Sequence, residues 1–171
     1  WGLFTTFKFG WGPHETGLSL MTVGVVNVVM QGFLLKPVLK RITPQRLAMI
    51  GLATSTVAYV AYGLAPQSWM VLAIIVLNMP SAATGSTLQS IVSGAADAHV
   101  QGRTLGAVSS LNSMMAVIAP LAGAGLLGLV SDASAGDIRL GLPFFVGSAL
   151  QFVALLLAIW HFRHQRQRAA Q

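Results

Sequence analysis

The residues of this sequence that could do chemistry are six amide side chains, each inside a long stretch without Asp, Glu, Lys or Arg. They are Asn27, Gln31, Asn78, Gln89, Asn112 and Gln151. An unpaired amide in apolar surroundings costs several kcal/mol, so such groups tend to face a partner or a water-filled cavity. These amides could therefore hold helices together by hydrogen bonds or bind a polar ligand, and both interpretations stay open at this point.

Spacing groups some of these amides on common helix faces. Asn27 and Gln31 are four residues apart, which places two side chains on one face of a helix. Asn78 and Gln89 are eleven residues apart, almost three turns, so they would share a face in an unbroken helix. Asn112 lies in a serine-rich segment, and Gln151 lies in the middle of the last apolar stretch.

Nothing in the sequence predicts an enzyme or a metal centre. There are no cysteines, and there is no Gly-x-Ser-x-Gly turn of the kind that carries a nucleophilic serine. The His14-Glu15 pair and the Asp97-Ala-His99 pair each offer too few ligands for a metal ion, and we expect them on opposite sides of a membrane. We therefore expect no catalytic residue, no cofactor and no metal.

The elements that position the amides follow from the composition. The chain has 171 residues, of which 54% are hydrophobic and 8% charged, and its mean hydropathy is +0.71. A soluble domain carries about 25% charged residues. Disorder and a disulfide scaffold are excluded by the apolar content and the absence of cysteine. The composition indicates an integral membrane protein.

Uncharged windows locate the membrane spans. They cover residues 16–35, 47–96, 104–131 and 140–162, and a spanning helix needs about 20 apolar residues. The second window is long enough for two spans, joined by a turn at Pro66-Gln67-Ser68. We expect complete helices over about 17–35, 47–65, 70–93, 104–130 and 140–162, with residues 1–9 as the last turns of a sixth helix that begins upstream, and 163–171 as a basic tail.

Basic residues set the expected orientation, because Lys and Arg are enriched in cytoplasmic connections. One side has eight of them: Lys36, Lys40, Arg41, Arg46, Arg103, Arg163, Arg166 and Arg168. The other side has Lys8 and Arg139. We expect the basic side, with the C-terminus, to be cytoplasmic. These basic residues lie between the spans and do not gather on one face, so no nucleic acid partner is expected. The basic tail is either a stop-transfer signal or a segment that contacts anionic lipid.

Glycines and prolines in the spans have two possible roles. Gly102 and Gly106 form a Gly-xxx-Gly pair, and Gly123 lies with Gly125 and Gly128 in one half of a span. Pro80 and Pro120 break backbone hydrogen bonds within spans. Such residues either allow close helix packing or let helices bend during a transport cycle. No acidic or basic residue lies deep in a complete span, so any proton coupling must come from outside this chain or from near an end.

Several motifs in order along the chain resemble the C-terminal half of a major facilitator superfamily transporter, and within it the tetracycline-efflux branch of drug/proton antiporters. They are Phe9-Gly-Trp11 with Thr16-Gly-Leu-Ser-Leu20, Gln31-Gly-Phe33, Lys40-Arg41, Ser68-Trp69-Met70, Leu88-Gln89, His99-Val-Gln101-Gly102-Arg-Thr-Leu-Gly106, and Ala119-Pro120-Leu121. The resemblance implies that Gln31 and Gln89 line the substrate path. It also places Pro120 in the pivoting eleventh helix and Arg41 in the basic loop after the eighth.

Two positions depart from that branch. Asn27 stands where these proteins carry a histidine in the eighth helix, and Ser55 stands where they carry an intramembrane aspartate in the ninth. Both family residues are tied to coupling, so tetracycline–cation antiport does not simply carry over to this chain.

The resulting expectation is an all-α, polytopic membrane protein. It would be the C-terminal six-helix bundle of a twelve-helix fold, with a truncated first helix. A small organic molecule would bind between this bundle and an N-terminal one and be exported across a bacterial inner membrane by alternating access. Two alternatives stay open: a non-transporting membrane subunit or truncated half-transporter that acts in packing or partner binding, and an uptake symporter of the same fold.

Overall fold

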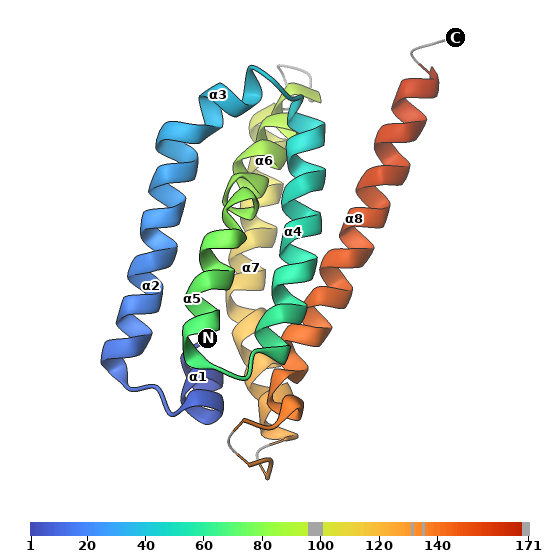
Figure 1. Ribbon diagram of the computed structural model, residues 1–171. Coiled ribbons are helices and arrows are strands. Elements are labelled where there is room, and N and C mark those ends of the chain that lie inside the picture. The colour runs from blue at the N-terminus through green and yellow to red at the C-terminus, as the bar shows by residue number, and fades with distance from the viewer. Residues whose placement is uncertain (96–100, 131, 135, 169–171) are drawn as a thin grey trace.

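A computed structural model describes residues 1–95, 101–130, 132–134 and 136–168, and these form a bundle of helices without a strand (Figure 1). The short helix α1 (Gly2–Phe9) precedes α2 (Pro13–Val28), which continues through a π-helical turn, η1 (Val29–Leu34), into α3 (Leu35–Leu39). The following elements are α4 (Pro44–Leu64), α5 (Ser68–Leu77), the 3₁₀ segment η2 (Met79–Ala83), α6 (Thr84–Ala95), α7 (Gln101–Gly128), the 3₁₀ turn η3 (Ile138–Gly141) and α8 (Leu142–Arg168).

Four helical segments of the described chain are long and apolar enough to cross a membrane. They are Pro13–Leu39, Pro44–Leu64, Gln101–Gly128 and Ile138–His164. A fifth span is complete only if Ser68–Leu77 and Met79–Gly94 are taken together, and this pair is bent by 51°. The all-helical, membrane-spanning class expected from the sequence is confirmed. The segment expected as one helix over 70–93 is two helices, because Pro80 has no N–H to continue the helical hydrogen bonds.

Helix starts follow local capping signals. Pro13 is the first residue of α2, where a missing N–H costs nothing, and the Gly12 N–H donates to Glu15 Oε2 at 2.9 Å. Pro44 opens α4 in the same way, with Thr43 as its N-cap and the Arg46 N–H donating to Thr43 Oγ1 at 3.4 Å. These signals lengthen both helices by three or four residues relative to the uncharged windows.

The closest helix packing is between α4 and α8. A Cβ added to Gly141, the last residue of η3, would lie 2.6 Å from the Cα of Gly63 in α4, so the two backbones are in contact directly before α8 begins. The Ser148 hydroxyl donates to the Thr56 carbonyl oxygen at 2.9 Å farther along the same pair. Small residues at crossings let membrane helices gain dispersion contacts that lipid cannot replace.

Aromatic rings gather at the end of the bundle that holds α1. The Trp1 ring meets Tyr62 edge-on at 5.4 Å between centroids, and Phe4 lies 4.4 Å from Phe144. Trp1 Nε1 also donates to Ser19 Oγ at 2.9 Å, which ties α1 to α2. We call Trp1, Phe4, Phe9, Tyr59, Tyr62 and Phe144 the aromatic cluster.

The two ends of the bundle differ in charge. Figure 1 places α3, the start of α4 and the C-terminal end of α8 together at one end, with α1 and the turn between α4 and α5 at the other. Lys36, Arg46 and Arg163 therefore lie at the same end, which we call the basic end. At the opposite end Asp137 pairs with Arg139 at 2.9 Å.

Candidate functional site

The break between α5 and α6 is built around Asn78. The helix α5 ends at Leu77, and the Asn78 N–H still donates to the Ile74 carbonyl at 2.9 Å. The Asn78 carbonyl then accepts from Ser81 twice, from its N–H at 3.0 Å and from its hydroxyl at 2.7 Å. These bonds satisfy the backbone at the bend and leave the Asn78 side chain free to point between helices.

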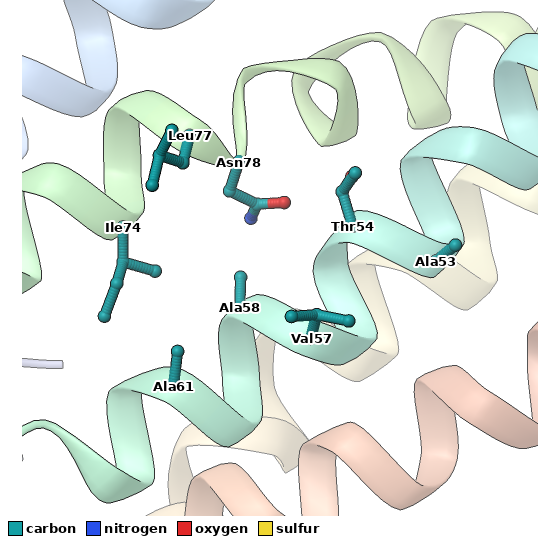
Figure 2. Close-up of a pocket in the computed structure, with 8 residues that line it drawn as sticks. All are labelled: Ala53, Thr54, Val57, Ala58, Ala61, Ile74, Leu77 and Asn78. Carbon is teal, nitrogen blue, oxygen red and sulfur yellow. The ribbon is translucent and has the colours of Figure 1, made fainter.

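That side chain lies in the shared wall of two cavities. The larger has a volume of about 330 Å³ between α4 and α5, and Figure 2 shows the Asn78 amide directed into it on the side of Thr54 and Ala58. Its lining is Ala53, Thr54, Val57, Ala58, Ala61, Ile74, Leu77 and Asn78. The smaller, of about 100 Å³, is lined by Val23, Val26, Asn27, Tyr62, Ile75, Asn78, Ser81 and Ala82.

Asn78 Oδ1 is buried and accepts no hydrogen bond from any residue that the structure describes. A buried amide oxygen without a donor is unfavourable. The Thr84 and Thr87 hydroxyls of α6 are also buried without a partner among the described residues. The walls around the Asn78 oxygen are almost entirely aliphatic, and Asn78 and Thr54 are the two polar residues among those that line the larger cavity.

Asn27 and Gln31 join the same region from α2 and η1. Gln31 Nε2 donates to Asn27 Oδ1 at 3.2 Å and to the Ala82 carbonyl at 3.3 Å. Asn27 Nδ2 donates to the Val23 carbonyl at 2.9 Å. Gln31 thus bridges two helices, and it lies in a π-helical turn, a distortion often found at functional sites. We call Asn27, Gln31, Asn78 and Ser81 the polar cluster.

The other three candidate amides lie elsewhere. Gln89 is exposed on α6, Asn112 is exposed on α7, and Gln151 is half-buried on α8. None of the three lines either cavity beside Asn78. The eleven-residue spacing of Asn78 and Gln89 does not imply a common face, because the 3₁₀ segment and the bend intervene.

Of the residues expected to act in conformational change, Pro120 and Arg41 are exposed and Gly123 is half-buried. Pro120 is exposed in α7, and a Cβ at Gly123 would meet nothing within 4 Å. Arg41 is exposed in the turn after α3, where its N–H donates to the Val38 carbonyl at 2.9 Å. The Asp97-Ala-His99 pair lies outside the described residues. Within them, no group of three His, Cys, Asp or Glu side chains could hold a metal ion.

Sequence reasoning missed the environment of Lys8, which it treated only as a loop charge. Lys8 is 4% exposed and donates to the Gly63 carbonyl, at the end of α4. Its Nζ lies 5.5 Å from the Phe4 ring centroid and 5.8 Å from that of Phe9. The available signal was local: phenylalanines four residues before and one residue after the lysine can form a cation–π site.

Long apolar helices that enclose amides define a polytopic membrane protein. Residues 2–171 match the Major Facilitator Superfamily. This chain belongs to that superfamily of transporters, and the resemblance seen in its motifs is confirmed.

Several curated relatives of the chain are tetracycline resistance proteins. The chain is 29% identical over 155 residues to the class C tetracycline resistance protein of Escherichia coli, a match that covers 91% of this chain and 38% of that protein. The class G protein of Vibrio anguillarum is 28% identical with the same coverage. The class D protein of Salmonella ordonez is 28% identical over 93% of this chain and 39% of its own length. No solved structure matches the chain.

Proposed function

We propose that this chain is the C-terminal six-helix bundle of a secondary transporter that exports a small organic molecule by alternating access. The chain spans less than two fifths of the curated relatives that it matches, and those relatives are named tetracycline resistance proteins. In this proposal an N-terminal bundle supplies the rest of the substrate site and the proton-coupling residues. The membrane is a bacterial inner membrane, with the basic end and the C-terminus on the cytoplasmic side.

The observation that carries the proposal is the Asn78 side chain at the helix break between two cavities, with a buried Oδ1 that has no donor among the described residues. An amide oxygen accepts a hydrogen bond, so the substrate must bring a hydroxyl, amide or protonated amine. The walls formed by Val57, Ala61 and Ile74 suit an apolar ring or chain. The substrate class is therefore a compact, mostly apolar molecule with at least one hydrogen-bond donor.

Gln31 and Asn27 have a different part in this proposal. The amide of Gln31 already joins two helices through the Ala82 carbonyl, so it holds the wall of the site in place. The bend at Asn78 and the π-helical turn at Gln31 lie on facing elements, where helices with broken regularity could change shape during the transport cycle.

The exposed amides contribute from the outside of the bundle. Gln89 and Asn112 lie on the surface of α6 and α7, and α7 is buried over only 6% of its most apolar window. We assign this surface, with Pro120 and Gly123, to contact with the N-terminal bundle, where Gln89 and Asn112 complete the substrate site. Gln151, half-buried on α8, is the most distant of the candidates.

The test is the variant Asn78→Leu in the complete protein, assayed for uptake into inverted membrane vesicles with tetracycline as the first probe. Losing one hydrogen bond of about 0.5–1.5 kcal/mol lowers apparent substrate affinity about two- to tenfold. The same substitution removes a buried acceptor without a donor, so the melting temperature should stay equal or rise. Weaker transport by an equally stable protein identifies a ligand contact.

The matched control is Thr56→Val on α4. The Thr56 hydroxyl donates to the Leu52 carbonyl of its own helix at 2.8 Å and lines neither cavity, so its loss should leave affinity unchanged. If Asn78→Leu transports every substrate of the parent protein with unchanged kinetics, Asn78 is not in the site.

The same assay tests the direction of transport. A parent protein that moves the probe out of inverted vesicles, instead of accumulating it inside them, would be an uptake symporter.

A further inference from the structure

A second pocket lies far from the polar cluster, between α4 and α8 at the basic end. Its volume is about 260 Å³, and it is lined by Arg46, Met49, Ile159, Phe162 and Arg163. Arg46 belongs to the first turn of α4 and Arg163 to the last turns of α8, so the antiparallel arrangement brings them to one end. We call it the arginine groove.

The shape of the groove follows from how α4 and α8 cross. At the opposite end the backbone of Gly63, near the end of α4, touches that of Gly141, which directly precedes α8. Figure 1 shows α8 leaning away from α4 toward the C-terminus. The space that opens is floored by the half-buried side chains of Met49, Ile159 and Phe162, with the two exposed arginines at the rim.

The two guanidinium groups have no carboxylate partner in the part of the chain that the structure describes. The ion pairs there are His14 with Glu15 and Asp137 with Arg139, and both lie at the end away from the groove. Arginine does not lose its charge in proteins. Among the described residues, two permanent cations from separate helices therefore border one apolar floor without a carboxylate partner.

We propose that the arginine groove binds an anionic glycerophospholipid. Its phosphate would be held between Arg46 and Arg163, which offer the planar donor pairs that match phosphate oxygens. An acyl chain would lie over Met49, Ile159 and Phe162. Basic pockets between membrane helices on the cytoplasmic side have the chemistry that recognises such headgroups. A soluble anion would leave the apolar floor without a contact. A neutral apolar molecule would leave the two arginines without a negative charge to bind.

Trp160, next to the arginine groove, is consistent with a position of the two arginines at the headgroup level of the bilayer. Trp160 is 61% exposed on α8, one turn before His164, whose ring it meets edge-on at 4.9 Å. Tryptophan prefers the headgroup region of a membrane. This places the arginine rim at the level of lipid phosphates and the floor at the level of the first acyl carbons.

The experiment is native mass spectrometry of the detergent-purified protein after incubation with phosphatidylglycerol or phosphatidylcholine. The parent protein should retain phosphatidylglycerol in preference to phosphatidylcholine. The double variant R46Q/R163Q should lose about tenfold or more of that retention, because each arginine near the membrane surface contributes separately to anionic lipid binding. If the parent protein retains phosphatidylglycerol and phosphatidylcholine equally, the proposal is overturned. This result does not depend on whether the variant can be purified.

The charge-matched control is K36Q/K40Q, which removes two exposed cations at the same end but outside the groove. This control should retain phosphatidylglycerol like the parent protein. Equal loss in both double variants would mean a diffuse charge effect and would overturn a specific site. Displacement of the lipid by glycerol phosphate at equal concentration would also overturn it, since a headgroup alone should not compete with a lipid seated on the apolar floor.

Discussion

The helices α4 and α7 have equal mean hydropathy but differ in how much of each helix is buried inside the bundle. The most apolar window of each has a mean hydropathy of 1.5, yet 44% of the α4 window is buried against 6% of the α7 window. Hydrocarbon lipid is as apolar as a leucine side chain, so hydropathy sets whether a helix enters the membrane and not which helix it contacts. Close contact depends instead on where backbones can approach.

The glycines of α4 and α7 show the same difference in packing at single positions. A Cβ on Gly63 would lie 2.4 Å from the Phe145 ring, and one on Gly51 would collide with the Thr84 side chain. In α7 a Cβ on Gly123, Gly125 or Gly128 would meet nothing within 4 Å. The same residue type is therefore a packing requirement in α4 and an open surface in α7, which is the surface that we assign to another bundle.

The largest effect should come from Gly141→Ala. Its new Cβ would be within 2.6–3.0 Å of Gly63 backbone atoms, which cannot rotate away, so α4 and η3 must separate just before the start of α8. We expect a loss of about 1–3 kcal/mol of stability, read as a lower melting temperature in detergent. Gly125→Ala on α7 is the control and should cost less stability, because nothing in the described part of this chain lies within 4 Å of its new Cβ. Equal losses from the two variants would remove the contrast between α4 and α7.

An intermediate effect should come from Gln31→Leu. This change removes the bond from Gln31 to the Ala82 carbonyl, and hydrogen bonds between membrane helices contribute about 0.6 kcal/mol on average. A modest fall in melting temperature, with transport reduced in proportion to folded protein, is expected. Asn112→Leu on the exposed face of α7 should leave the melting temperature unchanged. A stability loss at Asn112 larger than at Gln31 would mean that contacts on the α7 surface stabilise the protein more than the bond from Gln31 to the Ala82 carbonyl does.

The smallest effect should come from Asp137→Asn, at the end of the bundle opposite the arginine groove. Hydrogen bonds from Arg139 hold the pKa of the Asp137 carboxyl below its ordinary value of 3.8. A lowered folded-state pKa stabilises the fold above the unfolded-state pKa, and this contribution is lost as the pH falls through the folded-state value. Because the pair is exposed, we expect a barely measurable difference in melting temperature at pH 7 that vanishes in strong acid. A large difference at pH 7 would mean that the pair is covered.

Much of the architecture could be predicted from residues alone. The uncharged windows and the basic connections placed the helices, because each long apolar segment must satisfy its backbone hydrogen bonds internally when it enters lipid. The order of motifs such as Gln31-Gly-Phe33 and Ala119-Pro120-Leu121 also identified the superfamily. These properties belong to single segments and need no knowledge of their neighbours.

Tertiary structure alone determined which side chains meet. It joined Gln31 to Ala82, left Asn78 Oδ1 without a donor, and buried Lys8 against the end of α4. It also separated Asn78 from Gln89, although a regular helix would have aligned them. The physical reason is that helix spacing is a local regularity, which one proline can interrupt, whereas burial and hydrogen bonding depend on a second helix that is distant in the sequence.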